Sequence, residues 1–323
     1  MTEQSIDGVL VVDKPRGPTS HDIVFRVRRA LRMRAVGHAG TLDPMATGVL
    51  VIALGEATKL VPWLTAHDKA YEAEIALGVE TDTLDALGQE VARAPVPPAV
   101  VAALAAPADV AAGSPSLAEA FACERSRTSQ VPPVFSAIRT DGERSFARAR
   151  RGEAPDLAAR AVVVHELTLR GTIADPPSIA LRVACGKGYY VRSLAHDLAR
   201  GLGTVGHLTS LRRTRSGCFT LDEAVAGDAM RAEEITSRIA PLARAAARAL
   251  PVVRLRGSAV DDARHGRLVA ADAMAAADPR CRAPGAASAW FDEAGALIAV
   301  GRYEDDGRGR VIRGFAAHRI ALA

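Results

Sequence analysis

Cysteine is scarce in this chain of 323 residues, and its four cysteines lie far apart. They form no Cys-x-x-Cys pair and no Cys/His spacing of the kind that binds zinc. A structural zinc site is therefore not expected, and neither is a metal at the active centre. Unpaired thiols fit a reducing compartment, so we predict a cytoplasmic protein. The four residues are Cys123, Cys185, Cys218 and Cys281.

Long apolar runs, a secretion signal and nucleotide-binding glycine patterns are also missing. No apolar run approaches the ~20 residues that a helix needs to cross a bilayer. The first residues, Met1 to Asp7, are polar and acidic, unlike a signal peptide. The phosphate-binding pattern Gly-x-x-x-x-Gly-Lys-Ser/Thr is absent. We therefore expect no membrane partner and no cofactor.

The chain is rich in arginine, and the arginines are unevenly placed. The formal net charge is only +4, but the isoelectric point is about 9.1. Arginine binds phosphate groups in a bidentate manner, so its clusters favour a polyanionic partner. Each cluster taken alone fits a solvated helix face equally well. The clusters are Arg26, Arg28, Arg29, Arg32 and Arg34; Arg139, Arg144, Arg148, Arg150 and Arg151; and Arg212, Arg213 and Arg215.

The stretch of residues 36–55 is the most informative part of the sequence. Asp43 lies between a glycine-rich turn and Pro44, and the apolar run 49–54 follows. Proline fixes the backbone directly after the acid. The run is short, β-branched and bounded by glycine, so it predicts a buried strand. Local spacing leaves two interpretations of Asp43 open, a turn-forming or helix-capping residue and a reactive carboxylate on a rigid loop.

Several blocks, in order, resemble one family. The block Gly-His-Ala-Gly-Thr-Leu-Asp-Pro-Met-Ala-Thr-Gly-Val-Leu at 37–50 resembles the catalytic motif of the TruB-type tRNA pseudouridine-55 synthases, although most members have threonine in place of Ala39. Asp-Lys-Pro-x-Gly-x-Thr-Ser at 13–20 resembles the family's first motif, in which Lys14 is expected to support the catalytic loop. The other blocks are Lys-x-Tyr at 69–71, the segment 130–139, Gly-x-Tyr-x-Arg at 188–192 and the segment 203–217.

The resemblance implies roles for individual side chains. Asp43 would act as a nucleophile or as the base that assists elimination. Arg192 would pair with Asp43 and keep it ionised, and Tyr71 would pack on the target base and take part in proton transfer. His38 would fill the stack that the flipped base leaves. The other RNA- or base-binding residues that it implies are Asp85, Leu211, Arg139, Arg144, Arg148 and Arg151.

The resemblance also implies an α+β fold, the pseudouridine synthase fold, with a mixed, largely antiparallel sheet flanked by helices. Residues 1–249 would form the catalytic domain, with an arginine-rich RNA-clamping insertion at about 130–155. Residues 250–323 would form a small β-rich, PUA-like RNA-binding domain. The sequence pattern predicts a helix capped by Ser20, short helices in 94–118, a hairpin around 175–177, a helix from Val191, and a helical stretch at 221–249.

The function implied is isomerisation of uridine to pseudouridine at position 55 in the T loop of tRNA, after the base has flipped out. The expected partner is the tRNA T arm, with no obligate protein partner, and the chain is expected to be a monomer. One alternative is a non-catalytic RNA-binding or tRNA-folding protein on the same scaffold. Another is the guide-RNA-dependent branch of the family, against which the short N-terminal extension and the lack of a long basic tail argue.

Overall fold

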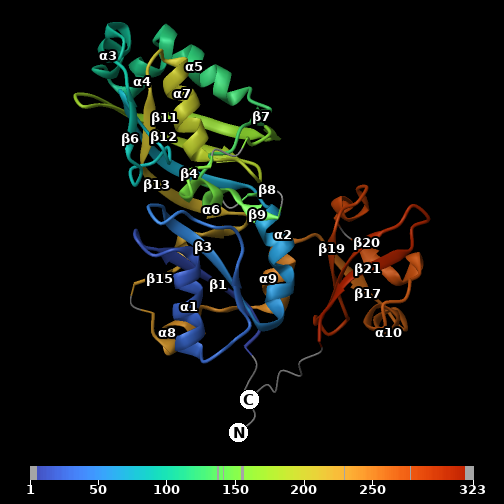
Figure 1. The fold of residues 1–323 in the computed structure, drawn as a ribbon. Coiled ribbons are helices and arrows are strands. Elements are labelled where there is room, and N and C mark those ends of the chain that lie inside the picture. The colour runs from blue at the N-terminus through green and yellow to red at the C-terminus, as the bar shows by residue number, and fades with distance from the viewer. Residues whose placement is uncertain are drawn as a thin grey trace.

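The computed structural model describes residues 6–136, 138–140, 142–153, 156–228, 230–276 and 278–316. Two sheets organise these residues, a ten-stranded sheet and a five-stranded sheet from the C-terminal part of the chain (Figure 1). The large sheet has the order β11 (Val164–Ala174), β12 (Pro177–Cys185), β4 (Lys69–Leu77), β13 (Gly206–Ser216), β3 (Thr47–Leu54), β1 (Gly8–Lys14) and β15 (Val225–Ala226). Three short strands complete it: β2 (Val36–His38) pairs with β3, β14 (Phe219–Thr220) pairs with β13, and β16 (Ala240–Pro241) pairs with β1.

Most neighbouring strands of the large sheet are antiparallel. The exceptions are β13 with β3 and β1 with β15, which are parallel. Strands β11 and β12 form the expected hairpin, with Ala174 opposite Pro177. These pairings confirm the prediction of a mixed, largely antiparallel sheet.

The sequence patterns of the strands follow from how many of their faces are covered. In β3, Leu50 and Ile52 belong to one hydrophobic cluster, and Val49 and Val51 belong to another on the opposite face. Both faces are therefore buried, which explains the uninterrupted apolar run. Strand β4 alternates instead, and its Glu72 is exposed. Strand β4 therefore has one covered face.

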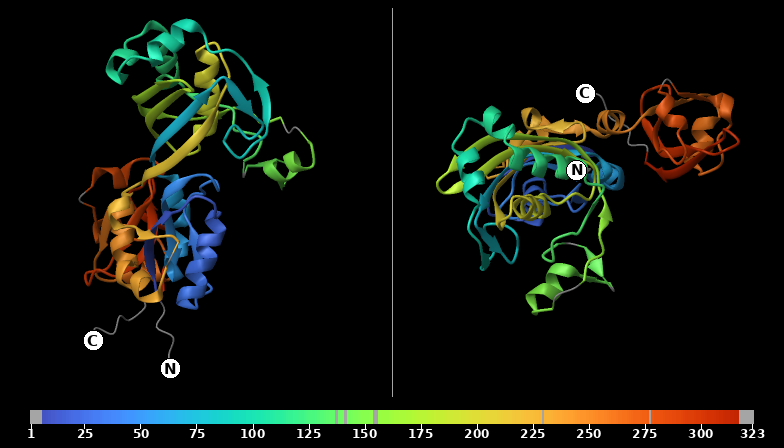
Figure 2. Two further views of the ribbon diagram at one scale, coloured as in Figure 1. Left: turned by 90° about the vertical axis from the view of Figure 1, so that its left-hand side faces the viewer. Right: turned by 90° about the horizontal axis from the view of Figure 1, so that it is seen from above.

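Helices cover the two faces unequally (Figures 1 and 2). The first hydrophobic cluster joins the sheet to α1 (Ser20–Leu31), α3 (Pro98–Leu104), α4 (Ala108–Ala112), α5 (Pro115–Arg125), α7 (Val191–Gly201) and α8 (Ala232–Arg238). The second cluster joins the other face to η1 (Gly55–Leu60), α2 (Val61–Ala66), α9 (Leu242–Ala249) and part of the C-terminal sheet. None of the helices in the described ranges combines the length and apolar character needed to span a bilayer.

Two predictions about helices need correction. The cap of α1 is Thr19, whose hydroxyl accepts from the Asp22 amide at 3.1 Å while the Asp22 carboxylate accepts from the Thr19 amide at 2.8 Å. Ser20, the expected cap, is the first helical residue. Residues 221–249 are not continuously helical. The elements η2 (Leu221–Glu223) and β15 come before α8, and β16 separates α8 from α9; both strands pair with β1. Proximity to the edge of the sheet outweighs the helix propensity of this alanine-rich stretch.

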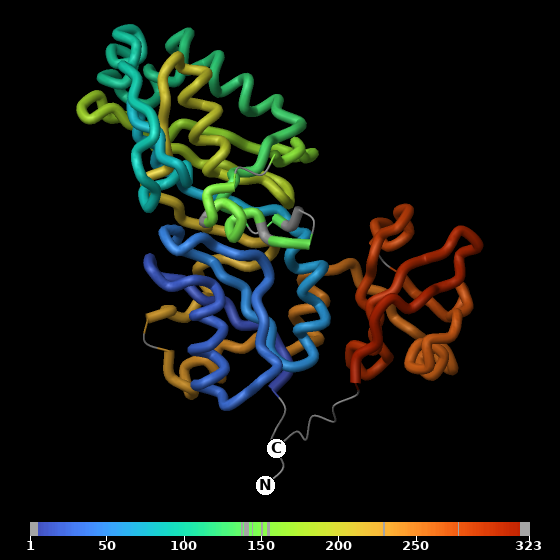
Figure 3. Tube along the Cα trace, in the orientation of Figure 1, coloured from blue at the N-terminus to red at the C-terminus, as the bar shows by residue number. Residues whose placement is uncertain are grey.

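An insertion projects from the large sheet (Figure 2) and, seen from the front, crosses its middle (Figure 3). It contains β8 (Arg139–Thr140), β9 (Glu143–Arg144) and α6 (Ser145–Arg150). A ladder of β7 (Ser129–Gln130) and β10 (Arg160–Ala161) forms its base. The side chain of Gln130 bonds to the backbone of Tyr190 in both directions, at 3.1 and 2.8 Å. The base of the insertion is thereby attached to the start of α7.

The small sheet has the order β18 (Met274–Ala276), β17 (Val252–Leu255), β19 (Ser288–Phe291), β20 (Leu297–Tyr303) and β21 (Gly309–Gly314). Trp290 is fully buried in it and donates to the hydroxyl of Ser288 at 2.9 Å. Phe291 of β19 and Phe315, the residue after β21, belong to the second hydrophobic cluster of the large sheet. The remaining elements are β5 (Val79–Thr81), β6 (Glu90–Arg93), α10 (Ala259–Arg264), η3 (Ala271–Ala273) and η4 (Pro279–Arg282).

Candidate active site

Four of the predicted residues, Asp43, Tyr71, Arg192 and Leu211, line one pocket, although they are far apart in the sequence. Asp43 lies on the loop between β2 and β3, Tyr71 on β4, Arg192 in the first turn of α7, and Leu211 on β13. The pocket has a volume of about 280 Å³, near the lower end of the range for small-molecule sites. The parallel pairing of β3 with β13 and the antiparallel pairing of β13 with β4 bring these segments together.

The carboxylate of Asp43 is paired with the guanidinium of Arg192. Nε lies 3.0 Å from Oδ2, and Nη2 donates to Oδ1 at 3.4 Å. The Arg192 side chain is only 5% exposed. Its other donor groups reach the backbone carbonyls of Thr83 at 2.9 Å and Phe135 at 2.8 Å. The guanidinium is therefore fixed from three sides and presents its positive charge to the acid.

Two opposing effects act on the pKa of Asp43. Loss of water around the carboxylate raises the pKa, and this is the larger effect. The charge and hydrogen bond of Arg192 lower it, while the nearby Asp85 raises it. The net direction is upward, although 35% of the side chain is exposed at the pocket. The resemblance implied that Arg192 keeps Asp43 ionised. Arg192 does lower the pKa of Asp43, but burial raises that pKa by more.

Asp85 lies behind Arg192 and is not one of the residues that line the pocket. Its Oδ2 is 3.7 Å from Nη1 of Arg192, and its side chain is 6% exposed. Oδ1 accepts from the hydroxyl of Thr83 at 2.8 Å and from the amide of Leu87 at 2.9 Å. This carboxylate is thus held toward Arg192, so its contact with a base, which the resemblance implies, would be indirect.

Tyr71 and Leu211 supply the apolar walls of the pocket. They are 8% and 7% exposed. Burial raises the pKa of the Tyr71 hydroxyl, an effect that the neighbouring Arg213 only partly offsets. Tyr71 therefore stays protonated at neutral pH and is able to donate a hydrogen bond.

Two residues of the first motif, Lys14 and Ser20, form hydrogen bonds with the backbone of the loop that carries Asp43. Lys14 is fully buried and donates to the carbonyls of Ala46 at 2.8 Å and Pro44 at 3.3 Å. Burial lowers its pKa to about 8. The hydroxyl of Ser20 accepts from the amide of Leu42 at 2.9 Å and donates to the carbonyl of the same residue at 3.1 Å. Lys14 therefore supports the loop of Asp43, as its motif implied.

Arg213 holds the other end of the loop, and sequence reasoning missed it. Its guanidinium donates to the carbonyls of Gly40 at 3.0 Å, Thr41 at 3.3 Å and Val49 at 2.7 Å. The side chain is 1% exposed. The sequence did contain a signal, because the alternation of a strand places Arg213 on the same face as Leu211.

Only part of the third arginine cluster is therefore available to bind phosphate, because Arg213 is turned inward. Arg213 is buried, and Arg212 forms a bidentate pair with Asp13 at 2.7 and 3.0 Å. Arg215 donates to the carbonyl of Gly217 at 3.1 Å. A run of arginines in the sequence does not show which side chains a strand turns inward.

His38 lies at the end of β2 and is not among the residues that line the pocket. Its ring contacts that of His21 on α1, with 5.4 Å between centroids and an angle of 79°. Burial, with the charges of His21 and Arg213, lowers its pKa to about 4. His38 is therefore neutral at physiological pH, and its buried Nδ1 has no hydrogen-bond partner among the described residues.

The arginines of the insertion are partly engaged with acids. Arg148 pairs with Glu153 at 2.7 Å, and Arg151 pairs with Glu143 at 2.8 Å and with Glu153 at 2.9 Å. Contact with phosphate would have to compete with these pairs. The side chains of Arg139 and Arg144, which the sequence also assigns to RNA binding, lie outside the described part of the structure.

Among the described residues, no group of three or more histidine, cysteine, aspartate or glutamate side chains is placed to hold a metal ion.

Comparison with known proteins places the chain in a family. A model described as TruB family pseudouridylate synthase (N terminal domain) matches residues 28–191, and one described as tRNA pseudouridylate synthase B C-terminal domain matches residues 192–244. The chain belongs to the TruB family. Both TruB models end before β17, so neither covers the five-stranded sheet.

Relatives named tRNA pseudouridine synthase B match this TruB chain over most of its length. The protein of Thermobifida fusca is 46% identical over 81% of this chain and 86% of its own. That of Aromatoleum aromaticum is 47% identical over 74% of this chain and 72% of its own. That of an Arthrobacter species is 39% identical over 91% of this chain and 92% of its own. The resemblance inferred from the motifs is confirmed.

Solved structures of similar shape confirm the pseudouridine synthase fold for this TruB chain. A chain of a Cbf5-Nop10-Gar1 complex has a TM-score of 0.68 and 25% identity, and the match covers 96% of this chain and 84% of that one. A chain of an H/ACA RNP bound to a substrate RNA containing 2'-deoxyuridine has a TM-score of 0.66 and 24% identity, with 96% and 85% covered.

Proposed function

We propose that this protein isomerises uridine to pseudouridine at position 55 in the T loop of tRNA. The observation that carries the proposal is the Asp43 carboxylate, paired with Arg192 and open to a pocket that Tyr71 and Leu211 line, in a chain of the TruB family. A base in a folded loop must flip out to reach such a pocket, at a cost of a few kcal/mol.

The reaction moves the bond at C1′ of the ribose from N1 to C5 of uracil. The N1–C1′ bond breaks and the C5–C1′ bond forms, while C5 loses a proton and N1 gains one. No electron acceptor or group donor is consumed. Ionised Asp43 acts as the nucleophile or as the base that assists elimination. Tyr71 packs on the uracil ring, and its protonated hydroxyl takes part in proton transfer.

We further propose two RNA contacts outside the pocket. One is the insertion with Arg139, Arg144, Arg148 and Arg151, in which phosphate groups would replace the glutamate partners of Arg148 and Arg151. The other is the five-stranded sheet, as a PUA-like domain of residues 250–323 beside a catalytic domain of residues 1–249.

The protein acts as a monomer in the cytoplasm. His38 fills the stack that the flipped uridine leaves.

Tritium release tests the reaction and its position together. Uridine labelled with tritium at C5 is placed in an unmodified tRNA, and a second tRNA has cytidine at position 55. We expect release from the first only. Release from both would mean that the target position is wrong.

Asp43→Asn separates catalysis from binding. The variant should lose release and keep its affinity for tRNA, because asparagine retains the shape of the side chain without its charge. If the wild-type protein releases no tritium from either tRNA and still binds both tightly, the protein instead binds or folds tRNA without modifying it.

A further inference from the structure

The exposed side of α1 and the turn after it carry a cluster of arginines that form no ion pair within the described ranges. Arg26 and Arg28 donate only to backbone carbonyls, those of Gly227 at 2.8 Å and Val36 at 2.7 Å. Within the described ranges, no ion pair is found for these two arginines or for the other three, which are Arg29, Arg32 and Arg34. The one acid of α1, Asp22, is bound to Thr19 in the helix cap.

Several arginines on other surface elements are paired with acids. Arg200 pairs with Glu80 at 2.9 Å, Arg248 with Glu223 at 2.7 Å, and Arg267 with Asp262 at 2.7 Å. The five arginines of residues 26–34 also exceed the formal net charge of the whole chain, +4. Five positive charges of this nearly balanced protein therefore lie close together on α1 and in the turn after it.

An aromatic ring lies among these charges. Phe25 is 65% exposed, more than any other large apolar side chain of the described residues. Helical spacing places His21, Phe25, Arg29 and Arg32 on one side of α1, opposite the buried Val27. A single exposed apolar residue is common. An exposed ring between arginines is instead the composition of a surface that stacks nucleobases and binds phosphates.

This face begins at the catalytic loop. Ser20 bonds to Leu42 one residue before Asp43, and the ring of His21 contacts that of His38. From His21 to Arg32 the helix rise carries the surface ~16 Å away from the loop. RNA with a uridine in the pocket would have its neighbouring nucleotides within reach of this face.

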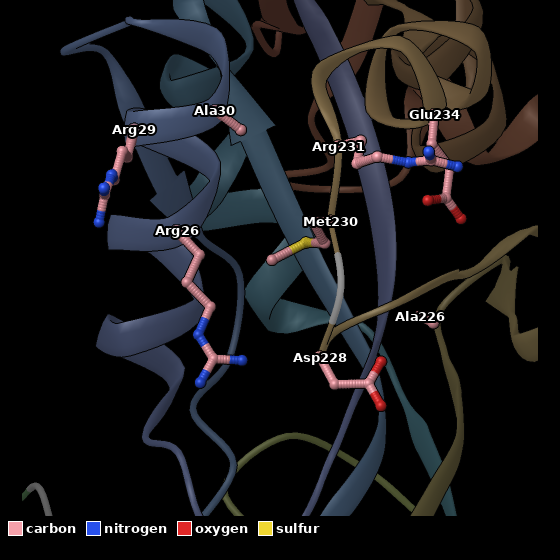
Figure 4. A pocket seen from close by; sticks show the side chains of 8 residues that line it. All are labelled: Arg26, Arg29, Ala30, Ala226, Asp228, Met230, Arg231 and Glu234. Carbon is pink, nitrogen blue, oxygen red and sulfur yellow. The ribbon is translucent and has the colours of Figure 1, made fainter.

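The opposite flank of α1 has a different character. A cavity of about 770 Å³ lies between that flank and α8, and its lining includes Arg26 and Arg29 as well as Asp228 and Glu234. Figure 4 shows Arg26 directed toward the segment of Asp228, whereas Arg29 points away from both acids. Acidic groups thus moderate the charge on that flank. The side with Phe25, Arg29 and Arg32 remains the electropositive one.

We propose that the side of α1 formed by His21, Phe25, Arg28, Arg29 and Arg32 is an RNA-docking surface of this enzyme. Phe25 stacks on an exposed base of the bound tRNA, and the arginines contact the phosphates of the strand next to the nucleotide in the pocket. The proposal rests on the proposed function, since it assigns an additional contact to the same substrate.

Two variants test the two parts of the surface. Arg29→Gln with Arg32→Gln should raise the Kd for unmodified tRNA at least tenfold near 0.1 M salt. It should also reduce the slope of log K against log salt by about 1.5, because binding no longer releases the counterions of the two phosphates that these arginines contact. Phe25→Ala should raise Kd about tenfold, the loss of one base stack, without changing that slope. Both changes lie on the solvent side of the helix, so the core is left intact.

Arg93→Gln with Arg200→Gln is the matched control, since both arginines are on the surface and paired with glutamate. We expect its Kd to equal that of the wild type. An equal loss of affinity in the control would assign the effect to overall charge and overturn the proposal. Wild-type affinity in both α1 variants would also overturn it, while tritium release by the wild type would still uphold the proposed function. No binding and no release by the wild type would defeat the proposed function itself.

Discussion

At the scale of single residues, the pairing of Asp43 with Arg192 makes the pH dependence of turnover testable. Arg192 lowers the pKa of Asp43 against a larger rise from burial, so Arg192→Met should raise that pKa further and leave less carboxylate ionised at neutral pH. We expect kcat at pH 7 to fall ~100-fold and the acid limb of its pH profile to move up by about 1–3 units.

Arg192→Lys is the conservative control, because it keeps the charge and loses the fixed fork of donors. It should shift the acid limb less than Arg192→Met does. A normal rate and an unmoved profile in Arg192→Met would show that the pair does not control the acid.

The hydroxyl of Tyr71 is also testable alone. Phenylalanine keeps the ring that packs against the base and removes only the proton donor, whose pKa burial has raised. We expect Tyr71→Phe to lower kcat ~100-fold, the usual size of a general acid–base contribution, with little change in the affinity for tRNA. Unchanged turnover would limit Tyr71 to packing.

At the scale of elements, the parallel pairing of β3 with β13 depends on one glycine. Gly48 has φ of +100°, and a Cβ there would lie 2.2 Å from the carbonyl oxygen of Arg213. Gly48→Ala should cost more than ~3 kcal/mol of the free energy of unfolding. Gly37→Ala is the control, because nothing lies within 4 Å of its Cβ, and should cost less than ~0.5 kcal/mol. Chemical denaturation of both variants measures the difference.

The sequence predicted the elements whose pattern is local. The hairpin of β11 and β12 and the start of α7 at Val191 both appear where periodicity and turn residues place them. The strands β15 and β16 were missed because each has two residues and exists only through pairing with β1. Tertiary contact decides such short elements.

The same distinction applies to the site. The resemblance of the motifs was sufficient to predict that Asp43, Tyr71, Arg192 and Leu211 lie at one site, and all four line one pocket. It could not show that Arg213 is buried against the catalytic loop, because burial depends on which strands become neighbours. Nor could it show that loss of water outweighs Arg192 at Asp43, since that balance depends on the packing around the carboxylate.

At the scale of the whole molecule, the two sheets share a hydrophobic cluster and should unfold together. Phe291 and Phe315 of the C-terminal residues pack in the cluster that contains Val9 and Val49 of the large sheet. In Trp63→Phe the remaining tryptophan is Trp290, which reports on the small sheet. Its fluorescence and the circular dichroism of the whole chain should change at the same denaturant concentration. Separate midpoints would show that the sheets are independent.

The raised pKa of Asp43 has a consequence for how this protein can tolerate mutation. An acid whose pKa is higher in the folded than in the unfolded state favours folding at low pH and opposes it once pH rises through its folded pKa. At neutral pH the ionised carboxylate that the reaction requires therefore weakens the fold that holds it. Asp43→Asn, although inactive, should melt at a higher temperature than the wild type. In thermal melts at pH 7.5, a lower melting temperature for Asp43→Asn than for the wild type would show that this acid stabilises the fold. Selection for stability alone would then remove the acid, and only selection for turnover would retain it.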